Sequence, residues 1–134
     1  MKTIHKIAAM VIQDNKFIMV RKFGKDTWTS LGGRIEEGET EEECLLREIK
    51  EEVNCDAKIL RKLGDFSDKA AFDDAMIKLS VYLVELIGTP EIIDNELEEF
   101  MFIGKNYAEE GIKLTKVMKS QVIPHMIKEN LLDW

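Results

Sequence analysis

A helix-start signal near the middle of the chain gives the firmest local prediction. Thr40 is followed three residues later by Glu43, the pairing that closes the N-terminus of a helix as a capping box. Apolar residues then recur at helical spacing, at Leu45, Leu46, Ile49 and Val53. We therefore predict a helix from about Glu41 to Val53 that buries these four side chains.

The sequence on both sides of this helix is typical of strands. Residues 7–12 and 17–20 form a predicted hairpin around the turn at 13–16, and 57–66 and 76–87 are two longer strand segments. We expect a polar loop over 92–99, a strand over 100–103 and a C-terminal helix over 116–132, which Pro124 kinks or restarts. Its inward side chains are Val117, Val122, Ile123, Met126 and Ile127. Intermixed strands and helices predict an α/β (α+β) fold with a mixed sheet.

Length and composition limit the domain count and the partners. The 134 residues fit a single domain over 1–134, and 45% hydrophobic residues are sufficient for a core. The 19 basic and 26 acidic residues give a net charge of −7, which disfavours a nucleic acid polymer as partner. A small anionic substrate remains compatible, because divalent cations bridge carboxylates to phosphates.

Compartment and membrane association follow from what the sequence lacks. No apolar run is long enough to span a bilayer, and the N-terminus does not resemble a signal peptide. Two cysteines form neither a disulfide framework nor a usual metal-ligand pair. We expect a reduced, cytoplasmic protein without a membrane partner.

The predicted helix carries an acidic stripe along the edge of its buried face. On a helical wheel the carboxylates beside this face are Glu41, Glu48, Glu51 and Glu52. Glu48 and Glu52 are i,i+4 neighbours about 6 Å apart, and at an effective dielectric near 20 such a pair repels by roughly 3 kcal/mol before screening. Clustered oxygens of this kind predict a site for Mg²⁺ or Mn²⁺ rather than zinc.

The stretch 33–55 resembles the Nudix box, G-x5-E-x7-R-E-U-x-E-E-x-G-U, in which U is an aliphatic residue. The matching residues are Gly33, Glu39, Arg47, Glu48, Ile49, Glu51 and Glu52. Asn54 and Cys55 replace the last two positions of the pattern. Because Asn tolerates a left-handed conformation better than most residues, we interpret Asn54 as an acceptable replacement. The resemblance implies an α/β/α sandwich with a mixed β-sheet between helices.

The resemblance to the Nudix family also implies a reaction and a set of metal ligands. The family hydrolyses diphosphate linkages in nucleoside diphosphate derivatives with Mg²⁺, or with Mn²⁺. We expect a nucleoside triphosphate substrate, including oxidised or non-standard ones, giving a monophosphate and pyrophosphate. Dinucleotides, nucleotide sugars and a non-catalytic nucleotide-sensing role are the alternatives. The implied metal ligands are Glu48, Glu51, Glu52, the carbonyl of Gly32 and a glutamate from a later loop, Glu96, with Glu98 and Glu99 as rivals.

The remaining candidate roles concern catalysis, which the resemblance implies, and substrate contacts, which rest on residue type. Glu48 is the expected general base and Glu52 the alternative, whereas Arg47 and Glu39 form an internal ion pair. Arg21 and Arg34 are assigned to substrate binding with the aromatic residues Trp28 and Phe72, which could stack on a base. Any one such aromatic residue is more often part of the core. The protein is expected to be a monomer or homodimer that takes a small-molecule nucleotide.

Overall fold

A mixed four-stranded sheet forms the centre of the computed structural model, which describes residues 2–69 and 74–134. Its strands lie in the order β5 (Leu31–Arg34), β1 (Lys2–Met10), β7 (Ala75–Ile87) and β6 (Asp56–Lys69). β1 runs parallel to β7, whereas β5 is antiparallel to β1 and β6 is antiparallel to β7. This arrangement confirms the predicted mixed sheet.

A second, smaller sheet extends the first one. It consists of β2 (Ile12–Gln13), β3 (Lys16–Lys22) and β8 (Leu97–Ile103), all antiparallel, while β4 (Thr27–Trp28) pairs with β9 (Lys113–Leu114). The predicted hairpin is present, and Asp14 and Asn15 both have positive φ at its turn, as tight hairpin turns require.

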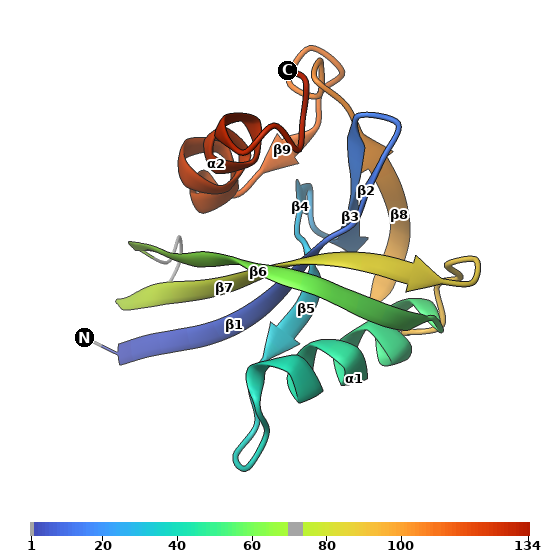
Figure 1. The fold of residues 1–134 in the computed structure, drawn as a ribbon, viewed down its shortest axis with the longest axis vertical. Helices are drawn as coiled ribbons and strands as arrows, with labels where there is room; N and C mark the ends of the chain where they lie inside the picture. The colour runs from blue at the N-terminus through green and yellow to red at the C-terminus, as the bar shows by residue number, and fades with distance from the viewer. Residues whose placement is uncertain (1, 70–73) are drawn as a thin grey trace.

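Helices cover both faces of the central sheet (Figure 1). α1 (Glu41–Val53) lies on one side, and a π-helical turn at Met118–Val122 followed by α2 (Ile123–Lys128) lies on the other. Alternation along β1 accounts for this sandwich: Ile7 and Ala9 join the core under α1, whereas Ala8 and Met10 join the core under α2. The centre of the sheet is therefore buried on both faces, and the predicted fold class is confirmed.

The helix α1 has the predicted bounds because local signals set both ends. Thr40 accepts a hydrogen bond from the Glu43 N–H at 3.1 Å, and Glu43 accepts one from the Thr40 N–H at 3.0 Å. Asn54 closes the helix at φ 55°, as expected for this replacement of glycine. The expected burial of Leu46 is wrong, because its side chain is 41% exposed at the edge of the contact with the sheet.

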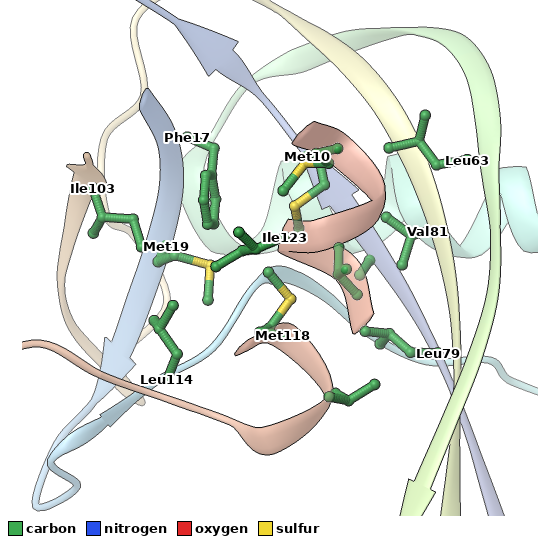
Figure 2. Packing of buried hydrophobic residues seen from close by; sticks show 14 of the residues in the cluster. Met10, Phe17, Met19, Leu63, Leu79, Val81, Ile103, Leu114, Met118 and Ile123 are labelled. Atoms are coloured by element: carbon green, nitrogen blue, oxygen red, sulfur yellow. The ribbon is translucent and has the colours of Figure 1, made fainter. Parts of the chain in front are cut away.

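The C-terminal helix is shorter and less regular than predicted. Met118 and Ile123 pack on Met10 and Met19 in the core shown in Figure 2. A π-helical turn precedes α2, and Pro124 lies in the first turn of α2, where its missing N–H costs no hydrogen bond. The helix ends at Lys128 rather than at residue 132. Consequently Ile127, expected to face inward, is 36% exposed.

The last residues form a strap over the hairpin instead of a helix. The Trp134 ring stacks on Phe17 at 5.7 Å, and its indole N–H donates to the Asn15 carbonyl at 2.9 Å. The Asn15 side chain also bonds both backbone groups of Asp133. These contacts stabilise the C-terminus in place of further helical turns.

Several strand boundaries also differ from the sequence-based expectation, and β1 begins at Lys2 and ends at Met10 rather than covering residues 7–12. β8 begins at Leu97, so the predicted loop over 92–99 ends earlier, because Leu97 is buried and Glu99 pairs with Arg21 across β3. β6 continues past residue 66 to Lys69 through pairing with Met76 on β7. Among the described residues, no helix has the length and apolarity needed to cross a membrane.

Candidate active site

Two consecutive glycines in β5 allow α1 to lie directly against the sheet. A Cβ built on Gly32, which has φ 130°, would lie 1.9 Å from the Ile7 carbonyl oxygen. A Cβ on Gly33 would lie 2.6 Å from the carboxyl carbon of Glu48. No other residue fits at Gly32, and any side chain at Gly33 would displace the carboxylate of Glu48.

Glu52 is a buried carboxylate on the sheet side of α1. Its side chain accepts a hydrogen bond from the Gly32 N–H at 2.8 Å, and the residue is only 7% exposed. Burial, together with the nearby charges of Glu48 and Asp94, raises the pKa of Glu52 to about 8, against the opposing effect of the Gly32 hydrogen bond. A cation at this position would therefore offset a considerable desolvation cost.

Arg47 pairs with four carboxylates around the start and the middle of α1, Glu36 among them at 3.7 Å. Its guanidinium contacts both oxygens of Glu39, at 2.6 and 2.9 Å, which holds the pKa of Glu39 down at about 2. It also donates to Glu48 at 2.9 Å and to Glu51 at 3.3 Å. The expected ion pair between Arg47 and Glu39 is present, and it ties the loop before α1 to the helix.

A loop before β8 closes the site from the opposite side. Its backbone is anchored at the end of α1, where Glu91 N–H donates to the Val53 carbonyl at 2.9 Å and Ile93 N–H to the Glu52 carbonyl at 3.3 Å. Asp94 then accepts a hydrogen bond from the Glu96 N–H at 2.8 Å. These contacts place both Asp94 and Glu96 at the wall of a cavity that Glu48 and Glu52 also line.

This cavity, of about 360 Å³, contains acidic and basic groups together. Its acidic residues are Glu48, Glu52, Asp94 and Glu96, and its basic residues are Lys6, Lys22 and Arg34. Within residues 2–69 and 74–134, no three carboxylate, histidine or cysteine side chains form a complete metal cluster. The donors present are carboxylate oxygens and the Gly32 carbonyl, a set suited to Mg²⁺ or Mn²⁺.

The structure brings most of the expected site residues to the cavity and leaves some outside it. Gly32, Arg34, Glu48, Glu52 and Glu96 line it. Glu51 does not, since its side chain is 55% exposed beside Arg47. The rivals of Glu96 are engaged elsewhere, because Glu98 and Glu99 lie 2.5 and 3.4 Å from the Arg21 guanidinium.

Two of the remaining candidates, Trp28 and Arg21, lie outside the cavity. Trp28 is 5% exposed in the core under α2, with the Arg21 guanidinium 5.6 Å from its ring centre. Neither Trp28 nor Arg21 lines the cavity, because Arg21 bonds the carboxylates of β8 and the Lys25 carbonyl instead. Phe72 lies outside the described residues.

Sequence reasoning missed several residues of the cavity wall, among them the polar residues Lys6, Thr29, Ser30 and Asp94. Lys6 had only a weak signal, since it lies next to His5 at the start of the apolar run that begins at Ile7. Asp94 had none, because only the hydrogen bonds between its loop and the end of α1 bring it to the site.

A family model confirms what this geometry indicates. The model, described as a NUDIX domain, matches residues 3–118. The chain belongs to the NUDIX family. The match includes the glycine bend, α1 and the loop that carries Asp94 and Glu96, so the resemblance of the 33–55 stretch extends to most of the NUDIX chain.

Individual relatives of this NUDIX protein have different names. The chain is 30% identical over 88 residues to the oxidized purine nucleoside triphosphate hydrolase of Mus musculus, which covers 63% of this chain and 46% of the relative. It is 29% identical over 116 residues to the ADP-ribose pyrophosphatase of Bacillus subtilis (strain 168), covering 82% of this chain and 62% of that protein. The chain thus spans less than two thirds of the length of either relative.

A solved structure shares the fold over nearly the full length. The solution structure of the E. coli ORF135 protein has a TM-score of 0.77 with 21% sequence identity, and the match covers 98% of this chain and 94% of that one. At this identity, the likeness shows the fold.

Proposed function

We propose that this NUDIX protein is a Mg²⁺-dependent hydrolase, active also with Mn²⁺, that cleaves a diphosphate linkage in a nucleotide derivative. Its expected substrate is a nucleoside triphosphate, including oxidised or non-standard forms, which it converts to the monophosphate and pyrophosphate. The observation that carries the proposal is the buried Glu52, which is held against the Gly32 bend beside Glu48 in a cavity that is also lined by basic side chains. A buried carboxylate beside a second one has little structural value unless a cation joins them.

The donor set fits a hard divalent cation. Glu52 and Glu48 would hold it from α1, with the Gly32 carbonyl from β5 and Glu96 from the loop before β8. Asp94 lines the same wall and is an additional oxygen donor. Glu51 remains a proposed ligand on the strength of the Nudix pattern, because its exposed side chain is free to rotate away from Arg47.

In the proposed reaction, water attacks one phosphorus of the diphosphate, a new P–O bond forms, and the bond to the bridging oxygen breaks. When bound, a divalent cation neutralises the diphosphate and makes water easier to deprotonate. Glu48 accepts the proton of the attacking water at its carboxylate, with Glu52 as the alternative base. Arg47, at 2.9 Å from Glu48, orients this carboxylate.

Basic residues at the cavity would bind the phosphates of the substrate. Lys22 and Arg34 are exposed and line the same cavity as the carboxylates of the loop. Their charges attract a polyphosphate to a protein whose net charge of −7 would otherwise repel it.

The second candidate substrate class is a diphosphate that bridges two sugars. The name of the Bacillus subtilis relative, an ADP-ribose pyrophosphatase, favours this class. A non-catalytic nucleotide sensor is the third possibility, and the intact set of Glu48, Glu51 and Glu52 disfavours it.

A hydrolysis screen tests the proposed function directly. The purified protein is incubated with nucleoside triphosphates (8-oxo-dGTP among them), dinucleotides, ADP-ribose and nucleotide sugars, with Mg²⁺ or with a chelator. We expect Mg²⁺-dependent release of a nucleoside monophosphate and pyrophosphate from a triphosphate. Turnover of ADP-ribose alone would move the protein to the second class, and tight nucleotide binding without any product would support a sensor.

A further inference from the structure

Lys6 is a half-buried lysine on the central strand β1 whose charge the fold does not neutralise. It lines the cavity, and within the described part of the chain its ammonium has no carboxylate within ion-pair distance. Other basic groups of the protein have such partners, for example Arg47 with Glu39 and Lys62 with Glu41. A desolvated cation without a partner is costly in a structural role.

The neighbours of Lys6 increase this cost. In the pairing of β1 with β5, Lys6 lies directly opposite Arg34, an arrangement in which like charges destabilise a sheet. Burial lowers the pKa of Lys6, and the charges of Lys22 and Arg34 lower it further. Three basic groups therefore share one region of the cavity, and none of them has an ion-pair partner in the described residues.

The register separates two of these basic residues, Lys6 and Arg34, from the carboxylates of α1. Gly33 lies between Gly32 and Arg34 on β5, and the Cβ it lacks would point at Glu48. Because side chains alternate along a strand, Arg34 and its partner Lys6 point to the other face. The cavity thus has a carboxylate side at α1 and a cation side across β5, so it suits an anion that extends beyond the scissile linkage.

We propose that Lys6 binds a phosphate of the substrate from the cation side of the cavity and favours triphosphates over diphosphates that bridge two sugars. A nucleoside triphosphate carries more negative charge along its phosphate chain than ADP-ribose does, and Lys6, Lys22 and Arg34 supply three positive charges to meet it. The inference rests on the proposed function, and it assigns Lys6 the role of a specificity-determining residue.

Binding of inorganic triphosphate to the metal-free protein tests this role without turnover. We expect Lys6→Gln to weaken triphosphate binding in calorimetry by about tenfold, the effect of losing one charge-assisted hydrogen bond. Lys6→Arg keeps the charge and should retain most of the affinity. The matched control is Lys2→Gln, since Lys2 is an exposed lysine on the same face of the same strand, and its affinity should equal that of the wild type. Equal affinity of Lys6→Gln and wild type, or no measurable binding by the wild type, would overturn the inference.

Steady-state kinetics provide the second measurement. For a nucleoside triphosphate, Lys6→Gln should raise KM by about tenfold and leave kcat nearly unchanged, whereas the constants for ADP-ribose should stay the same. An equal loss on both substrates would refute a role in specificity. If the wild type binds triphosphate through Lys6 but hydrolyses nothing, the proposed function fails while the phosphate site stands.

Discussion

Replacing Glu52 by Gln should stabilise the metal-free protein. The amide oxygen of Gln can still accept the Gly32 N–H hydrogen bond, at 2.8 Å in the wild type, while the buried charge disappears. Burial raises the pKa of Glu52 from 4.5 to about 8, so the folded state holds its proton more tightly than the unfolded state. The contribution of Glu52 to the stability of the wild type is therefore fully present below pH 4.5 and is lost as the pH rises towards 8.

The size of the effect follows from the same shift. Relative to a carboxyl whose pKa stays at 4.5, the buried Glu52 lowers the free energy of unfolding of the wild type by about 3 kcal/mol at pH 7 and by about 1 kcal/mol at pH 5. Glu52→Gln should therefore exceed the wild type in free energy of unfolding by about 3 kcal/mol at pH 7 and by about 1 kcal/mol at pH 5. Saturating Mg²⁺ should narrow the difference, because it binds and stabilises the folded wild type.

Guanidinium unfolding with a chelator, at both pH values, measures these quantities. Glu51→Gln is the matched control: it removes a carboxylate one position away on α1 whose side chain is 55% exposed, and it should change stability by less than about 0.5 kcal/mol. A Glu52→Gln protein that is less stable than the wild type, or whose advantage does not grow between pH 5 and pH 7, would refute the reasoning.

Three further predictions concern the residues around this carboxylate. Arg47 holds the pKa of Glu39 down at about 2, so the ionised Glu39 stabilises the protein above pH 4.5 and this contribution should disappear as the pH falls towards 2. The free energy of unfolding of Glu39→Gln should therefore decrease less than that of the wild type over this pH range. Gly33→Ala should abolish most Mg²⁺-dependent turnover while the circular dichroism spectrum stays native. The alanine Cβ would lie 2.6 Å from the carboxyl carbon of Glu48 and would displace that carboxylate; full activity would contradict this geometry. Asn54→Gly should keep activity and raise the free energy of unfolding by up to about 1 kcal/mol, since Asn54 has φ 55°, and a clear loss of activity would argue against this conformation.

The bounds of α1 could be predicted from sequence because the signals are local. The capping box of Thr40 and Glu43 and the left-handed Asn54 act within one turn of the chain. The exposure of Leu46 and Ile127 could not be predicted, because a helical wheel gives the direction of a side chain but not the width of the surface that covers it. The π-helical turn before Pro124 likewise depends on packing against the sheet.

Part of the site could be predicted because some of its residues are close together in the sequence. Glu48 and Glu52 come from one helix, and the Nudix pattern assigns them together. Asp94 and Lys6 come from a loop and a strand that only the tertiary fold brings to the cavity. The position of Trp28 outside the cavity could not be predicted either, because its burial under α2 depends on residues 90 positions away, such as Met118.

The rate of diphosphate hydrolysis by Glu52→Gln at saturating Mg²⁺ tests the central claim most directly. The claim is that the carboxylates at the glycine bend act with a divalent cation on a diphosphate. Loss of one such group should reduce kcat by at least about 100-fold relative to the wild type, in a variant whose folded state is intact. A Glu52→Gln protein that releases the same products at the wild-type rate would contradict the account.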